Sequence, residues 1–142
     1  MAEVKNILFL CIGNTCRSQM AEGFARNIVK QKSLDIGIES GGTSAMGVVN
    51  GDSIRAMKEV GIDISTQTSD QVTDEMIEKA QAIITLGCCS VDELCPVGIY
   101  GDKVVREDWP IKDPLGKPWD FMEMVRDDIG YRVEELFERI CS

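Results

Sequence analysis

The sequence contains no histidine, and its 142 residues hold no long apolar run. Without histidine, the chain has no Cys-His nucleophile pair, no Ser-His-Asp triad and no histidine ligand for a metal. Acid–base chemistry must therefore use aspartate, glutamate, lysine, tyrosine or cysteine. No stretch approaches the roughly 20 apolar residues of a membrane span, and no basic segment precedes the short apolar run near the N-terminus. We therefore expect a cytoplasmic protein with no membrane partner.

Positive charge is also scarce, because 15 lysines and arginines face 24 aspartates and glutamates, for a net charge of −9. Nucleic acids and anionic membranes attract basic surfaces, so this balance argues against both as partners. A small anionic substrate stays compatible, since a few local donors dominate a small pocket. The length suits one domain over residues 1–142, which we expect to be a monomer.

Apolar patterning predicts strands that alternate with helices. The expected strands cover residues 4–10, 36–41, 81–86 and 103–107, and the expected helices cover residues 18–32, 52–60, 73–79 and 118–140. Asp52 is the expected cap of the second helix, and the prolines and glycine of residues 108–117 predict a loop. This alternation predicts an α/β fold, a three-layer sandwich in which a four-stranded parallel sheet carries helices on both faces.

Cysteines gather after two of the predicted strands. Cys11 follows the first strand, and Cys88, Cys89 and Cys95 follow the third. Parallel sheets bind ligands beyond the carboxyl ends of their strands, so both groups lie where a site is expected. In a reducing compartment such cysteines are reactive thiols or ligands more often than structural disulfides. Cys141, next to the C-terminus, is expected to be an incidental exposed thiol.

The segment CIGNTCRS, residues 11–18, predicts an oxyanion site at a turn from strand to helix. Such a turn points several backbone N–H groups into one small space, and the planar fork of Arg17 can hold two oxygens of a tetrahedral anion. The same groups and the Ser18 hydroxyl favour the Cys11 thiolate, which makes it the expected nucleophile. The expected oxyanion-binding residues are Cys11, Ile12, Gly13, Asn14, Thr15, Cys16 and Arg17.

Asp113 is the candidate general acid, because it precedes Pro114 in the loop after the last predicted strand. The proline restricts Asp113 to extended conformations and so aims its side chain. By itself, Asp-Pro is also a common turn.

These motifs resemble the low-molecular-weight protein tyrosine phosphatase superfamily and, more narrowly, the arsenate reductases built on that fold. The resemblance covers essentially the whole chain, and its first motif is highly specific. It implies that Asp113 is the general acid. The position after Asp-Pro is often aromatic in the phosphatases but is Leu115 here, and Trp109 is the candidate to replace that aromatic side chain. The matching segments are FLCIGNTCRSQMAEGFAR, AMKEVGIDISTQTSD, ITLGCC, EDWPIKDP and FMEMVRDDIG.

The resemblance implies a relay of three cysteines in which Cys11 attacks arsenate and a second thiol then attacks the Cys11 sulfur. Cys95 would close the exported disulfide, and thioredoxin, a glutaredoxin or a low-molecular-weight thiol would reduce it. The second thiol is Cys88, with Cys89 as the alternative, and Gly87 is a plausible hinge before them.

Other interpretations remain open at this point. The second cysteine cluster could ligate zinc, although its spacing is poor for that metal. The chain could instead be a phosphotyrosine phosphatase with incidental thiols, or a redox sensor or anion-binding protein without turnover. No cofactor is expected, except that the resemblance implies a possible potassium ion. The residues that match the potassium site are Asn14, Glu22, Ser40 and Asp70.

Overall fold

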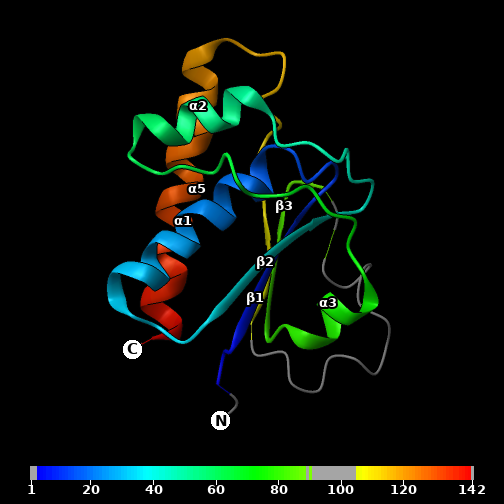
Figure 1. The fold of residues 1–142 in the computed structure, drawn as a ribbon, viewed down its shortest axis with the longest axis vertical. Coiled ribbons are helices and arrows are strands. Elements are labelled where there is room, and N and C mark those ends of the chain that lie inside the picture. The colour runs from blue at the N-terminus through cyan, green and yellow to red at the C-terminus, as the bar shows by residue number, and fades with distance from the viewer. Residues whose placement is uncertain (1–2, 89, 91–104, 142) are drawn as a thin grey trace.

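Strand β1 (Asn6–Cys11) lies inside a parallel sheet of four strands (Figure 1). The computed structural model describes residues 3–88, 90 and 105–141. The strands are ordered β2–β1–β3–β4, where β2 is Gly37–Gly42, β3 is Ala82–Leu86 and β4 is Val105–Trp109. Every neighbouring pair is parallel. All of β3 is buried, as expected for a parallel strand covered on both faces.

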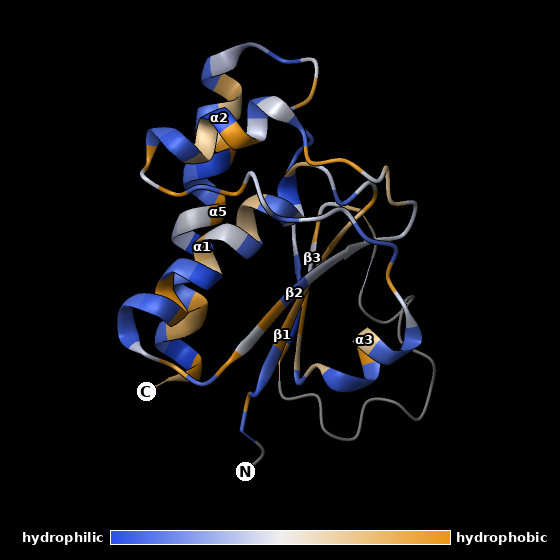
Figure 2. Cartoon of the chain, viewed as in Figure 1, coloured by the Kyte–Doolittle hydropathy of each residue, from blue (hydrophilic) through white to orange (hydrophobic). Residues whose placement is uncertain are grey.

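Helices cover both faces of the sheet. Helices α1 (Arg17–Lys32), α2 (Gly51–Glu59) and α5 (Trp119–Ile140) pack together on one face, and α3 (Asp74–Lys79) lies on the other (Figure 1). Alternate residues of β1 serve the two cores: Phe9 packs under the three-helix face, and Leu10 packs with Ile77 of α3. Figure 2 shows apolar residues along the central strands and both polar and apolar residues along the helices. The predicted three-layer α/β sandwich is confirmed.

Two local predictions were wrong. Strand β4 runs to Trp109, two residues into the predicted loop, because Asp108 and Trp109 pair with Thr85 and Leu86 of β3. The cap of α2 is Asn50 rather than Asp52. The Asn50 side chain accepts hydrogen bonds from the backbone N–H groups of residues 52 and 53, so Asp52 lies within the first helical turn.

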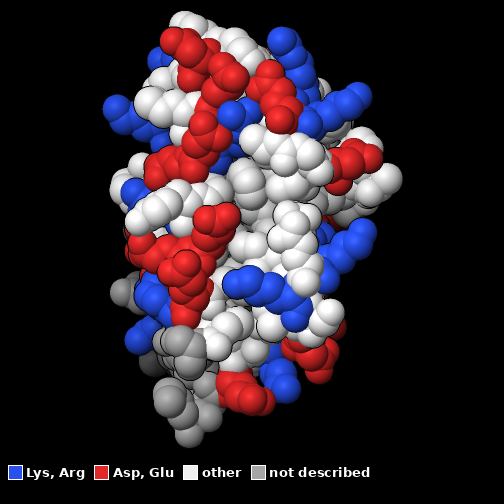
Figure 3. Space-filling model, turned by 90° about the vertical axis from the view of Figure 1, so that its left-hand side faces the viewer, with Lys and Arg blue, Asp and Glu red and all other residues white. Residues whose placement is uncertain are grey.

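The negative charge lies on the outside of the molecule. Figure 3 shows acidic side chains in a band over one face, with lysines and arginines beside them. Ion pairs on the surface include Arg132 with Asp128 and Arg139 with Glu107, and such pairs contribute little to stability. Within the described residues, every helix is too short or too polar to cross a membrane.

Candidate active site

The loop between β1 and α1 forms the floor of the candidate site. Cys11 is the last residue of β1 and is only 2% exposed, and Arg17 is the first residue of α1. Between them, Asn14 adopts a φ of 48°, a left-handed conformation that asparagine tolerates better than most residues. Gly42 of β2 backs the loop closely. A Cβ atom on Gly42 would lie 2.6 Å from the carbonyl oxygen of Ile12, so a larger residue would displace the loop.

The carbonyl groups of this loop are held by the surrounding protein. The N–H and C=O of one planar trans peptide point in opposite directions. The N–H groups of residues 12–16 are therefore fixed in orientation by the bonds that hold the five carbonyls from Cys11 to Thr15. Their partners are the backbone N–H groups of Thr43, Ser44, Met46 and Asn50 for residues 11, 12, 13 and 15, and the Gln19 side chain for residue 14.

A pocket of about 170 Å³ opens over this loop. It brings Cys11 and Arg17 together with Asp113, which comes from the loop after β4. Three residues expected to act on one anion therefore share one small cavity. The lining residues are Cys11, Ile12, Gly13, Thr15, Cys16, Arg17, Ser44, Met46, Asp113 and Leu115.

Ser18 is placed to stabilise a thiolate at Cys11, since its Oγ lies 2.9 Å from the Cys11 Sγ. Asn14 Nδ2 donates a hydrogen bond of 2.7 Å to the same Ser18 oxygen. The asparagine is fixed in this orientation because its Oδ1 accepts from the backbone N–H of Asp70 at 2.8 Å. The Ser18 oxygen is thus an acceptor for Asn14, which leaves its own proton to donate to the sulfur.

Arg17 is buried to 6% exposure beside the pocket. Its NH1 donates a hydrogen bond of 3.0 Å to the carbonyl oxygen of Ile111, in the loop after β4. This bond uses one corner of the planar guanidinium, so the other N–H groups can bind an oxyanion in the pocket.

Asp113 is exposed, as a proton donor to a small substrate at the pocket mouth needs to be. Its Oδ1 accepts a hydrogen bond of 3.0 Å from the backbone N–H of Leu115, which holds the side chain against its own loop. Pro114 between them is buried, so the loop is anchored at that point. Asp108 and Asp120, which lie near Asp113 in the sequence, do not line the pocket.

Cys16 lines the same pocket but has a different character. Burial raises the pKa of the Cys16 thiol to about 12, and the nearby Asp113 and Cys11 add to the rise. The Ser53 hydroxyl and Arg17 oppose this shift only in part. Among the described residues, the buried Ser53 hydroxyl makes no hydrogen bond of ordinary geometry, so its stabilisation of a thiolate is weak. Cys16 is therefore a neutral thiol next to the nucleophile.

This high pKa predicts a loss of stability in alkali. The folded state keeps the Cys16 proton above the ordinary thiol pKa of 9.0, so the stabilisation is present below pH 9 and lost as the pH rises toward 12. Between pH 8 and 10, the reduced wild-type protein should lose about 1.4 kcal/mol more unfolding free energy than Cys16→Ala. Urea titrations of both proteins test this, and parallel pH profiles would contradict it.

Cys88 lies next to β1, the strand that ends at Cys11. Its Sγ is 3.9 Å from the carbonyl oxygen of Leu10, the residue before Cys11. Cys88 is half-buried and takes part in a disulfide bond, whereas Cys11, Cys16 and Cys141 are free. The other members of the predicted relay, Cys89 and Cys95, lie outside the described residues, and so the zinc alternative is not tested either. Cys141 is exposed, as expected of an incidental thiol.

The four residues matched to a potassium site do lie together, but they satisfy one another. Glu22 accepts a hydrogen bond from Ser40, and Asn14 turns its amide nitrogen, not its oxygen, toward Ser40 at 3.0 Å. Arg26 Nε donates to the second Glu22 oxygen at 2.7 Å, so the buried carboxylate already has a counter-charge. Asp70 reaches the cluster through its backbone N–H. This arrangement does not suit a potassium ion, which needs oxygen atoms turned toward it.

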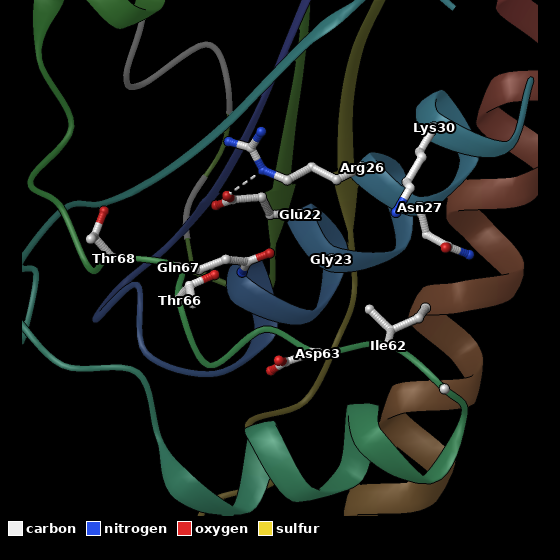
Figure 4. A pocket seen from close by; sticks show the side chains of 11 residues that line it. Glu22, Gly23, Arg26, Asn27, Lys30, Ile62, Asp63, Thr66, Gln67 and Thr68 are labelled. Atoms are coloured by element: carbon white, nitrogen blue, oxygen red, sulfur yellow. Dashed lines mark hydrogen bonds and ion pairs between the residues drawn. The ribbon is translucent and has the colours of Figure 1, made fainter. Parts of the chain in front are cut away.

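A larger pocket of about 610 Å³ lies between α1 and residues 61–68 (Figure 4). Glu22 and Arg26 form its ion pair at one side, and Gln67 and Thr68 approach from the other. Gln67 donates to Gln19, which in turn donates to the carbonyl oxygens of Asn14 and Thr68. The pocket does not contain Cys11, so its size does not make it the reaction site.

Trp109 cannot replace the aromatic residue that follows Asp-Pro in the phosphatases. It is buried to 4% exposure, its ring packs at 52° to Phe9, and its Nε1 donates to Glu107 at 2.9 Å. The suggestion that it grips a substrate was wrong, because the extension of β4 places it in the core. Leu115 lines the pocket instead, so the described wall has no aromatic ring.

Comparisons with known proteins agree with this geometry. The family model of the low molecular weight phosphotyrosine protein phosphatases matches residues 6–142. The chain belongs to this family. Within it, the chain is 44% identical to an arsenate reductase of Brevibacillus brevis, over 97% of this chain and 98% of that protein. It is 43% identical to arsenate reductase 1 of Staphylococcus haemolyticus, over 96% and 97% of the two chains.

A solved family structure, an arsenate reductase in its phosphate-binding state, superposes with a TM-score of 0.81. It is 36% identical, and the match covers 96% of this chain and 98% of that one. The family fold expected from the sequence is therefore confirmed.

Several residues that support the site were not identified from the sequence. Gln19 is fully buried, and Arg26 and Ile111 support Glu22 and Arg17. Gln19 lies on the predicted helix and could have been suspected, because a buried amide needs partners. The Ile111 contact is made by a backbone carbonyl, which residue identity does not reveal.

Proposed function

We propose that this protein is an arsenate reductase, which converts arsenate to arsenite. The observation that carries the proposal is the small pocket in which Cys11 and Arg17 lie over a loop whose N–H groups are fixed in orientation by five bonded carbonyls. Such an array binds a tetrahedral oxyanion directly over a thiolate. The names of the relatives at 43–44% identity favour reduction over phosphate-ester hydrolysis.

In the first step, the Cys11 thiolate attacks arsenic, and a sulfur–arsenic bond replaces an arsenic–oxygen bond. The departing oxygen takes a proton from Asp113 and leaves as water. Arg17 and the loop N–H groups hold the remaining oxygens and their negative charge. The Ser18 hydroxyl, 2.9 Å from the Cys11 sulfur, can donate a hydrogen bond to the attacking thiolate.

In the second step, a second cysteine attacks the Cys11 sulfur as a thiolate. A sulfur–sulfur bond forms, and the electron pair of the broken sulfur–arsenic bond stays on arsenic, which leaves as arsenite. The third cysteine then attacks the second and releases Cys11 as a thiolate. We assign the second role to Cys88, whose sulfur is near Leu10, and the third role to Cys95. Cys89 is the alternative for the second role.

The oxidised pair must be reduced from outside. Thioredoxin is the proposed donor, and a glutaredoxin or a low-molecular-weight thiol is the alternative. We also propose that the protein is a cytoplasmic monomer, because a relay of free thiols needs a reducing compartment.

A coupled assay tests the proposal. Reduced protein with arsenate, thioredoxin, thioredoxin reductase and NADPH should oxidise one NADPH for each arsenate reduced. Cleavage of a phosphotyrosyl peptide without arsenate-dependent NADPH loss would identify a phosphatase instead. If neither reaction occurs, a reversible disulfide between Cys88 and Cys95 would point to a redox sensor.

Replacing Cys95 with serine should stop the relay after one turnover. The reduced variant should release one equivalent of arsenite and then stall with Cys11 joined to the second cysteine. Peptide mass spectrometry of the stalled protein identifies that cysteine as Cys88 or Cys89. Cys141→Ser is the matched control and should turn over normally. Repeated turnover by Cys95→Ser with thioredoxin as sole reductant would contradict the order of the relay.

A further inference from the structure

Gly87 follows the last residue of β3 and stands directly before Cys88. Its φ is +77°, a region that side chains disfavour. A Cβ atom on Gly87 would lie 1.9 Å from the carbonyl oxygen of Ile111 and 2.6 Å from NH1 of Arg17. Gly87 therefore occupies a space where any side chain would meet the group that holds Arg17.

The Ile111 carbonyl cannot easily retreat from such a side chain. The Ile111 side chain is 3% exposed in the larger core, and its backbone N–H donates to the Trp109 carbonyl at 2.8 Å. Trp109 is itself fixed in β4. A residue larger than glycine at position 87 would therefore shift the loop backbone or break the bond between Arg17 and Ile111.

Three other glycines have a similar φ but no close neighbour, so they show the effect of backbone strain without a collision. Gly47, Gly61 and Gly116 have φ values of 81°, 81° and 79°, and nothing lies within 4 Å of a Cβ built on any of them. An alanine at these positions would meet the torsional penalty alone. At Gly87 it would meet the same penalty and a collision with backbone.

We propose that Gly87 is a positioning residue for the oxyanion site, acting through the Ile111 carbonyl and Arg17. The inference rests on the proposed role of Arg17 in binding the anion. The contact joins three parts of the reaction, since Gly87 precedes Cys88, Arg17 lines the pocket and Ile111 stands two residues before Asp113. A displacement at Gly87 therefore reaches the anion ligand and the acid loop together.

Orthophosphate affinity tests this role without requiring arsenate reduction. Orthophosphate should slow the alkylation of Cys11 by iodoacetamide in the reduced protein, which peptide mass spectrometry follows as a function of phosphate concentration. Gly87→Ala should raise the apparent Kd for orthophosphate about tenfold, since a charge-assisted contact is misplaced. Gly61→Ala, the control at nearly the same φ, should lower the Tm by less, because it meets the torsional penalty alone, and should leave the Kd unchanged. Equal Kd values for Gly87→Ala and the wild type would overturn the proposal.

A second measurement uses the unsubstituted chain, so it decides even where Gly87→Ala does not fold. Gly87 is not among the described residues that line the pocket. If Arg17 links it to the anion, the amide NMR signal of Gly87 should shift on addition of orthophosphate, with the Kd measured at Cys11. The Gly61 signal should stay in place. An unmoved Gly87 signal at saturating phosphate would refute the link.

The outcomes also separate this inference from the proposed function. If Gly87→Ala weakens orthophosphate binding but the wild-type protein reduces no arsenate, the inference about Gly87 stands and the reductase proposal is wrong. If the wild-type protein reduces arsenate and Gly87→Ala binds phosphate normally, the reductase proposal stands and the inference about Gly87 is wrong.

Discussion

Replacing Cys11 with serine should abolish arsenate reduction in the coupled assay. A serine hydroxyl at this position is far less ionised than a thiol and cannot form the sulfur–sulfur bond that the relay requires. The expected rate is at background, and the Tm should stay close to that of the wild type because the two side chains are similar in shape. Arsenite release measured over a single turnover is the decisive quantity.

The same variant should still bind orthophosphate, since the loop N–H groups and Arg17 remain. Isothermal titration calorimetry would separate loss of chemistry from loss of the site. Cys141→Ser is the control for removing a thiol, because Cys141 is exposed and remote from the pocket. Arsenite formation by Cys11→Ser above background would show that another cysteine is the nucleophile.

Asp113→Asn should slow the first step by roughly 10²- to 10⁴-fold, the usual contribution of a general acid. The amide keeps the shape of the side chain but has no proton to give to the departing oxygen. Rapid-quench measurement of arsenite formation by reduced protein, with saturating arsenate, isolates this step from reduction by thioredoxin.

Asp120→Asn is the matched control for Asp113, because Asp120 is exposed in the first turn of α5 and does not line the pocket. Its rate should remain within about twofold of the wild type, as for a surface substitution away from the site. A wild-type rate for Asp113→Asn would remove this residue from the mechanism and leave water as the proton source.

Most of the fold and the centre of the site could be predicted from patterns within short stretches of sequence. The strand before Cys11 is continuously apolar because both faces are buried, and the motif up to Ser18 concentrates its information in eight adjacent residues. Helix α3 begins where the sequence places Thr73, whose hydroxyl accepts a hydrogen bond from the N–H of Met76. In each case the cause of the structure lies within a few residues of its signal.

Contacts between distant segments could not be predicted in this way. Arg17 and Ile111 are 94 positions apart, and their bond uses a carbonyl that every residue possesses. Trp109 shows the same limit, since its burial depends on how far β4 continues to pair with β3. A glutamate on a helix such as Glu22 is usually solvated, yet Ser40 and Arg26 make Glu22 part of a buried network.

The five outward-bonded carbonyls of the Cys11–Arg17 loop have an energetic consequence for substrate capture. Their partners fix the peptide planes when the chain folds, so the entropy cost of ordering them belongs to folding and not to each encounter with an anion. The peptide dipoles are preorganised at the pocket that Cys11 lines, and little reorganisation remains as charge redistributes during reaction. The segment over residues 43–50, remote from the chemistry in sequence, is thus the scaffold on which the strength of that electrostatic field depends.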